Sequence, residues 1–486
     1  MKKTIKYTAL IVLILTLFAG CESWLDVNTD PNAIVDSPAI TESTYLIGIE
    51  AEWADKAIIM FPWWNAMSDM VLWYSIQQST PRSFIIDPAY GNDIWNSYTG
   101  SLKHAVALYD KAKANGNFHY QGIAGVIAAW HWFLITDLYD QAPLEQAMKG
   151  AQYRYPEVAS QSEIYAAADA LLVEAIGLFA GPSGDLAPGR DDYMLDGDMD
   201  AWTRLAWAIR ARQAMRLTYA AGTTPVAQAD LALSHLTNAM QPGDIVAWQH
   251  ATDQANWSWI WSDGQLYDYT GEGMTPNIFL VDLMNSSNDP RRPKMFTTAE
   301  QGGYKGLVAG AMFAAGDKPS RYSNDFATQD YPDIIMLYHE CLFLKAEAYA
   351  LKAQYANCQT ALDAAIRADM EFQGVADADI VTFLAQSSLD VPTNIEDAQK
   401  LVIEQKYIAG VYESYEAYFD FIRTGYPEFD FPNSILNVAN DYTFPRRYMY
   451  PSAEMDKNPN IQAIGQPDYL VTGTSWDRKS FAWRTK

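Results

Sequence analysis

Apolar residues recur along most of this chain at the three- and four-residue spacing that places side chains on one face of a helix. Within residues 95–114, for example, Leu102, Ala105 and Leu108 follow this spacing. Residues 123–138 are almost wholly apolar and predict a buried helix. The same criterion predicts helices over residues 164–179, 202–219, 227–240, 335–352, 356–372 and 396–422. The pattern therefore indicates a mainly α fold.

Neighbouring predicted helices are joined by turns and carry alanine where two helices would pack. The clearest pair has a first helix around residues 342–349, a turn at 352–355 and an alanine-rich second helix around 361–365. Such pairs are typical of tetratricopeptide-like helical hairpins, although small alanine side chains also permit close approach in generic helix packing. We expect these hairpins to pack with a loop-rich, ligand-binding face.

Two long segments lack a sustained period. Residues 242–330 are rich in Gly, Asn, Asp, Pro and Trp and predict an insertion of ordered loops with short strands. Residues 426–486 form a second loop-rich segment, in which repeated prolines are expected to break any helix. We assign residues 37–486 to a single domain that contains both segments.

The first residues have the pattern of a signal peptide. Lysines at positions 2, 3 and 6 precede an apolar run over 9–19 that is too short to span a bilayer. The sequence Phe18-Ala19-Gly20-Cys21 resembles the bacterial lipobox, with Phe where Leu is usual. We expect cleavage after residue 20, lipid attachment at Cys21 and a polar tether over residues 21–36. The alternative is an ordinary secretory signal that contains a cysteine.

Composition excludes several classes of protein. The 486-residue chain has 34 basic and 59 acidic residues, and its net charge of −25 is unsuited to neutralising nucleic-acid phosphates. Three cysteines are too few for a disulfide framework or a multi-cysteine zinc site. Cys341 and Cys358 fall on consecutive predicted helices, and we expect two buried free thiols there rather than a disulfide.

The sequence offers little catalytic machinery. It contains no Gly-x-Ser-x-Gly elbow, phosphate-binding loop or Cys-x-x-Cys, and His339-Glu340 lacks the second histidine of a zinc-protease motif because Phe343 stands there. The acidic stretch 191–200 has oxygen ligands but not the spacing of an EF-hand, so we interpret it as a solvated loop that caps the helix at Trp202 rather than as a calcium site. We expect no catalytic residue, no metal and no cofactor.

Aromatic residues are the better lead to a binding site. Aromatic residues make up 13% of the chain, and the three tryptophans of 257–261 alternate with other residues at the period of a strand. Aromatic faces beside Asn, Asp, Gln and Arg suit a sugar, whose C–H groups stack while its hydroxyls hydrogen-bond. The alternative is a hairpin that buries its indoles. The candidate ligand residues are Trp73, Tyr74, Gln78, Arg82, Trp257, Trp259, Trp261, Tyr267 and Tyr269.

An ordered set of short motifs resembles the SusD/RagB family of nutrient-binding outer-membrane lipoproteins. These motifs are Cys21 with Trp24-Leu25-Asp26, Thr29-Asp30-Pro31-Asn32, Trp95-Asn96-Ser97-Tyr98, residues 137–144, Gly197-Asp198 before Trp202, Asp289-Pro290-Arg291, residues 338–349, Glu404-Gln405-Lys406-Tyr407, Tyr418-Phe419-Asp420, residues 423–427 and residues 445–451. Residues 137–144 lack the Gly and Tyr of the family's Gly-Asp-x-Pro-Tyr turn. The motifs span almost the whole chain after Cys21.

The resemblance implies a cell-surface lipoprotein that binds glycan or oligosaccharide and sits as a lid over a SusC-like TonB-dependent transporter. It also places both aromatic segments at the ligand face. Three alternatives stay open: capture of a peptide or another nutrient, a structural lid without ligand, and a surface glycan hydrolase. The hydrolase would need a carboxylate pair, for which Asp263, Asp268 and Glu272 are candidates.

Overall fold

The computed structural model describes residues 40–58, 71–73, 88, 92–253, 258, 260–261, 274–307, 318–412, 414–429 and 445–477. Its helices are α2 (Glu42–Ile58), α4 (Asn92–Trp95), α5 (Ser101–Asn115), α6 (Phe118–Tyr139), α7 (Gln161–Phe179), α8 (Met199–Arg216), α9 (Pro225–Leu236), α10 (Ile278–Ser286), α11 (Arg292–Met295), α12 (Tyr338–Leu351), α13 (Tyr355–Phe372), α14 (Asp377–Leu384), α15 (Ile395–Ala409), α16 (Ser414–Thr424), α17 (Ser452–Lys457) and α18 (Pro459–Ile464). The strands form three two-stranded antiparallel sheets: β1 (Val71–Trp73) with β5 (Met274–Pro276), β2 (Ala142–Pro143) with β3 (Val158–Ala159), and β4 (Ile245–Trp248) with β6 (Asp333–Leu337).

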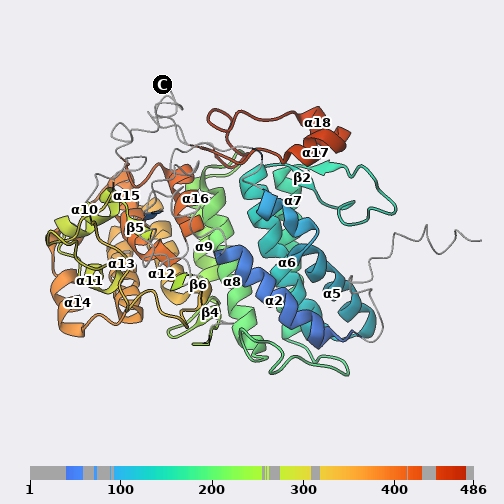
Figure 1. Ribbon diagram of the computed structural model, residues 1–486, viewed down its shortest axis with the longest axis horizontal. Helices are drawn as coiled ribbons and strands as arrows, with labels where there is room; N and C mark the ends of the chain where they lie inside the picture. Colours follow the sequence, from blue (N-terminus) through green and yellow to red (C-terminus); the bar gives the residue numbers. More distant parts are fainter. Residues whose placement is uncertain are drawn as a thin grey trace, which may run out of the picture.

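Paired helices build most of the molecule, which confirms the expected mainly α fold. Helix α6 packs on α5 and α7, α8 packs on α9, and α12 packs on α13. Helix α12 also contacts α8, α9 and α15 and so joins the two helical halves that Figure 1 shows side by side. The helices begin where the sequence supplies caps. Ser160 and Glu163 form a reciprocal capping box on α7, and Thr224 caps α9 before a proline at its first position.

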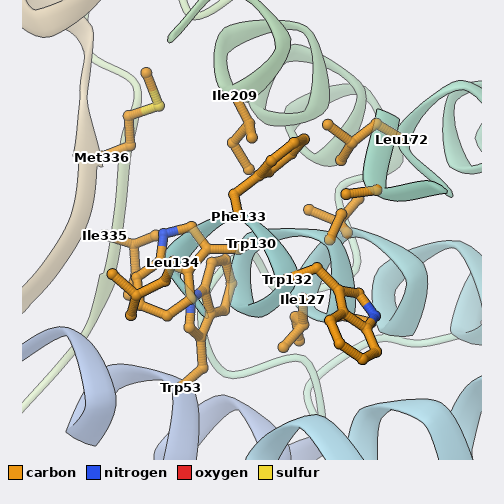
Figure 2. Close-up of a cluster of buried hydrophobic side chains, with 14 of the residues drawn as sticks. Trp53, Ile127, Trp130, Trp132, Phe133, Leu134, Leu172, Ile209, Ile335 and Met336 are labelled. Carbon is orange, nitrogen blue, oxygen red and sulfur yellow. The ribbon is translucent and has the colours of Figure 1, made fainter. Parts of the chain in front are cut away.

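Helix α6 is the centre of the larger core. Its 22 residues are almost all buried, and within the described part of the chain it is the one helix long and apolar enough to cross a bilayer. Trp130 of this helix meets Trp53 of α2 edge-on at 5.9 Å between ring centroids. Trp53 also stacks on Trp202 of α8 at 6.2 Å. Figure 2 shows Trp53 and Trp130 among the aliphatic side chains of this core.

Several boundaries differ from the expectation. The single helix predicted over 396–422 is two helices, because α15 ends at Ala409 and a short 3-10 turn starts at Gly410 before α16. Helices α10 and α14, and the amphipathic α2, were not among those predicted. The tail contains α17 and α18, because Pro459 occupies the first turn of a helix, where no hydrogen bond is lost.

Buried charges join the helical layers. Arg212 of α8 pairs with Glu340 of α12, and Arg423 of α16 pairs with Glu347 of α12 at 2.6 Å. Lys406 of α15 lies 2.8 Å from the carboxylate of Asp420. All six side chains belong to a network that is at least nine-tenths buried, so each charge is compensated within the protein. Cys341 and Cys358 are also buried, as free thiols, and burial raises the pKa of Cys358 to about 12.

Candidate functional site

Strand pairing brings the two predicted aromatic segments together. Trp73 at the end of β1 pairs with Met274 at the start of β5, and Val71 pairs with Pro276. Because the strands are antiparallel, the end of β1 that leads into residue 74 lies beside the end of β5 that follows residue 273. The two segments are about 200 positions apart in sequence, yet their described ends meet at one place.

A tight junction holds β5 in position. The buried side chain of Asn277 follows β5 and caps α10 by accepting a hydrogen bond of 2.7 Å from the N–H of Phe279. The N–H of Leu307 donates to the carbonyl of Pro276 at 3.0 Å, and the N–H of Ile278 donates to the carbonyl of Leu307 at 2.7 Å. The backbone approaches so closely that a Cβ atom at Gly306 would lie 2.4 Å from the nitrogen of Ile278. This crossing gives the candidate site a rigid base.

The described part of the tryptophan-rich segment is held by backbone contacts. The N–H of Ser258 donates to the carbonyl of Gln329 at 2.8 Å, and its hydroxyl donates to the carbonyl of Thr328 at 2.9 Å. The same hydroxyl accepts a hydrogen bond of 3.2 Å from the N–H of Trp261. Ile260 is 1% exposed, whereas Trp261 is only half-buried. Ile260 and Trp261 lie in a helical turn, so the predicted strand is wrong at Trp261.

A buried aromatic stack lies beneath this segment, and sequence analysis did not identify it. Phe296 stacks on Tyr322 at 5.9 Å, and Tyr322 stacks on Phe326 at 4.8 Å. Phe326 in turn contacts Tyr331 at 5.3 Å. Residues 328 and 329, which hold Ser258, lie between the last two rings in sequence. Ile260 belongs to the same buried hydrophobic cluster as Phe296, Tyr322 and Phe326, so the tryptophan-rich segment is packed on this core. The available sequence signal was the spacing of aromatic residues over 322–331.

The predicted ligand residues are described to different extents. The side chain of Trp261 is placed, and Trp73 is placed through the backbone of β1. Outside the described residues lie Tyr74, Gln78, Arg82, Trp257, Trp259, Tyr267 and Tyr269, together with Cys21, the predicted signal and tether, and the hydrolase candidates Asp263, Asp268 and Glu272.

The family motif Asp289-Pro290-Arg291 is a structural unit beside the site. The guanidinium of Arg291 is fully buried and donates to Asp289 at 2.6 Å, to Asp369 at 2.8 Å and to the amide oxygen of Gln405 at 2.8 Å. Neighbouring carboxylates raise the pKa of Arg291 despite its burial. The motif therefore clamps the chain after α10 onto α13 and α15 rather than contributing a charge to a surface.

The acidic stretch 191–200 also has a structural role. Asp198 caps α8 by accepting from the N–H of Ala201 at 2.9 Å, as expected of a capping loop. Asp192, however, is 1% exposed and accepts from the N–H of Gly197 and the indole of Trp202, so the expectation of a solvated loop is wrong at this residue. Within the described ranges, no group of three or more His, Cys, Asp and Glu side chains has the geometry to hold a metal.

Comparisons with known proteins bear on the family and on the fold. The profile of a SusD-like family, described as starch-binding and associating with the outer membrane, matches residues 46–451. A solved SusD homologue from Bacteroides uniformis has 20% identity and a TM-score of 0.76, with 90% of this chain and 99% of that chain covered. A SusD/RagB family protein from Bacteroides thetaiotaomicron has 22% identity and a TM-score of 0.71, with coverages of 91% and 100%. A structure described as a chitin-binding protein has 19% identity and a TM-score of 0.73, with coverages of 90% and 100%. No curated protein sequence matches.

Proposed function

This chain belongs to the SusD-like family, and on that premise we propose that it is a cell-surface lipoprotein that binds glycan or oligosaccharide and delivers it to a SusC-like TonB-dependent transporter of the outer membrane. The family description supports carbohydrate binding in association with the outer membrane. The chitin-binding relative supports the same class of ligand. Capture and delivery by this particular chain are the parts of the proposal that experiment has to test.

The pairing of β1 with β5 carries the assignment of the ligand face. It joins a segment that begins at Trp73 to the segment that ends at Met274, and each contains several of the predicted aromatic and polar ligand residues. Indole and phenol rings offer flat apolar surfaces to the C–H groups of a sugar, and amide and guanidinium groups pair with its hydroxyls. Trp261 adds a half-buried side chain, and its backbone N–H is held by a hydrogen bond to the hydroxyl of Ser258.

Attachment through a lipid at Cys21 completes the proposal. Acyl chains on one cysteine anchor a protein stably, and a polar tether over 21–36 would leave the domain free to move on the membrane surface. The anchor would keep the domain in the same membrane as the transporter. This would raise the effective concentration of the domain at the transporter. The partner proposed on this basis is a SusC-like transporter.

The decisive experiment is binding of the purified protein to a panel of polysaccharides, followed by isothermal titration with oligosaccharides of the preferred polymer. The proposal expects saturable binding of at least one glycan, without new reducing ends after prolonged incubation. Binding of peptides but of no glycan would replace the ligand class. Release of reducing ends would instead establish the hydrolase. Failure to bind any glycan or peptide would reduce the protein to a structural lid.

A further inference from the structure

A cavity lies among the helices, apart from the β1–β5 pair. It has a volume of about 570 Å³ and opens between α7, α8 and α9, with Phe133 of α6 among its lining residues. In Figure 1, α8 and α9 lie near the centre of the molecule and α7 lies to their right. The volume is within the range of small-molecule sites, and no residue of β1 or β5 lines it.

On the two walls formed by α7 and α8, the residues that line this cavity recur at the spacing of one helix face. On α8 the lining residues are Arg210, Gln213 and Ala214, at positions i, i+3 and i+4, and Leu217, which caps the C-terminal end of the helix, follows at i+7. These positions share one helix face. Helix α7 lines the opposite side with the same spacing around Ala166. The cavity is therefore a trough along about two helical turns, or roughly 10 Å.

Three side chains of the trough carry enclosed polar atoms without a hydrogen-bond partner in the described part of the protein. They are Oε1 of Gln213, Oε1 of Gln228 and Nδ1 of His235. Gln213 is 9% exposed and His235 is 7% exposed. An enclosed polar atom that stays unpaired destabilises the folded protein, because it has lost its hydrogen bonds to water. Rotation about the last torsion of each glutamine exchanges its oxygen and nitrogen, so each amide can present either a donor or an acceptor to the trough.

The charges along the trough are already compensated. The guanidinium of Arg210 holds the carboxylate of Asp169 with hydrogen bonds of 2.6 and 3.2 Å, and it lies 4.8 Å from the ring centre of Trp207. Trp207 also packs on the imidazole of His235 at 5.3 Å. Burial, aided by the charge of Arg210, lowers the pKa of His235 to about 4, so this imidazole is neutral at physiological pH.

These features select one class of ligand. An anion or a cation would have to disrupt the pair of Arg210 and Asp169, and a purely apolar molecule would leave the two amides and the imidazole unpaired. A hydroxyl group both donates and accepts, so it can pair with either face of an amide and with either tautomer of an imidazole. The C–H groups of the same molecule would contact Phe133, Ala214 and Leu217.

We propose that the trough between α7, α8 and α9 is a binding site for a small neutral polyhydroxylated molecule, an open-chain polyol or a monosaccharide. The site is separate from the proposed glycan face and does not depend on it. Its lining comes mainly from α7, α8 and α9, with further residues from the turn before α9 and Ser475 from the C-terminal segment. Hydroxyl groups would pair with Gln213, Gln228 and His235, and the apolar wall would receive the C–H edge.

The first test uses mannitol and glucose as probes in ligand-observed NMR, which separates binding from the general stabilisation that polyols give proteins. Ala166 lines the trough from the exposed side of α7, and Ala170 lies one turn later on the same helix without lining it. Ala166→Leu should abolish saturation transfer to the probe that binds, and Ala170→Leu should preserve it. Absence of binding in the unmodified protein, or equal binding in both variants, would overturn the proposal.

A second variant distinguishes a ligand contact from a structural one. Gln213→Met keeps the length of the side chain and removes its polar atoms. The proposal expects unchanged or higher stability, because an unpaired acceptor is removed, together with roughly tenfold weaker binding of the probe. Lower stability with unchanged probe binding would make Gln213 a structural residue and overturn the assignment. Trp259→Ala, which alters the proposed glycan face, should leave binding of the probe intact, so the two sites can fail independently.

Discussion

The carboxyl group of Glu50 on α2 is buried against that of Asp192. Glu50 is 0% exposed and Asp192 is 1% exposed, and Glu50 also accepts a hydrogen bond of 2.8 Å from the N–H of Tyr193. Burial, with the charge and hydrogen bond of Asp192, raises the pKa of Glu50 from 4.5 to about 10. Glu50 is therefore protonated at neutral pH, and the hydrogen bond that it accepts from Tyr193 fastens α2 to the loop ahead of α8.

This pair predicts a pH-dependent stability. The folded-state pKa of Glu50 lies above its unfolded value, so between pH 4.5 and about 10 the unfolded chain releases a proton that the folded protein keeps. The free energy of unfolding should fall as pH rises in this window, by at most about 1.4 kcal/mol per pH unit. Glu50→Gln should flatten this dependence and be at least as stable as the unmodified protein at pH 8, as measured by urea unfolding. Exposed Glu157→Gln is the control, and an equally steep profile in Glu50→Gln would contradict the interpretation.

Arg423 belongs to one of the motifs that carry the family resemblance, and we expect it to stabilise the folded protein. Arg423 is 1% exposed and pairs with Glu347 and Asp420. Arg423→Ala removes the arginine partner of the buried Glu347 carboxylate and leaves Asp420 with Lys406 alone as a cationic partner. We expect a loss of about 3–5 kcal/mol in the free energy of unfolding. Arg367 is the control, because its pair with Asp377 is more exposed, and Arg367→Ala should cost no more than about 1 kcal/mol. Similar losses in the two variants would argue against the buried network.

Sequence reasoning identified the helical fold because its signal is local. Helix α6 is an unbroken apolar run, and the hairpin of α12 and α13 has a regular helical period on both sides of its turn. Helix α2 was missed although Leu46, Ile49 and Trp53 follow the same spacing. Its signal is present in the sequence but shorter and interrupted by charged residues.

The site depends on relationships that local periodicity does not contain. Strands β1 and β5 have three residues each and lie about 200 positions apart, so local periodicity does not predict their pairing. The family resemblance implied only that both aromatic segments lie at the ligand face. Asp192 looked solvated because its neighbours are acidic, whereas the indole of Trp202 and backbone N–H groups compensate its burial. The local composition therefore predicts the wrong environment for a charged residue whose hydrogen-bond partners are brought to it only by the fold.

Lipidation is tested at the predicted attachment residue. Cys21→Ser removes the thiol that would carry the lipid, so the variant should accumulate as unprocessed precursor or as protein that is no longer membrane-bound. Membrane fractionation and intact mass measure the two effects. Cys341→Ser is a control for general loss of a thiol, because this residue is buried in the core. Unchanged attachment and mass in Cys21→Ser would refute the anchor.

The aromatic face is tested by truncating its indoles. If Trp73, Trp259 and Trp261 stack on sugar rings, each Trp→Ala variant should lose about 1–3 kcal/mol of glycan binding, with little change in the thermal midpoint. Trp202 is the matched control, because it is 0% exposed and its truncation should leave a cavity that costs about 3–5 kcal/mol of stability. Affinity and midpoint measured on the same variants separate the two roles. A large fall in midpoint with unchanged affinity at positions 73, 259 and 261 would return these indoles to the core and require another ligand face.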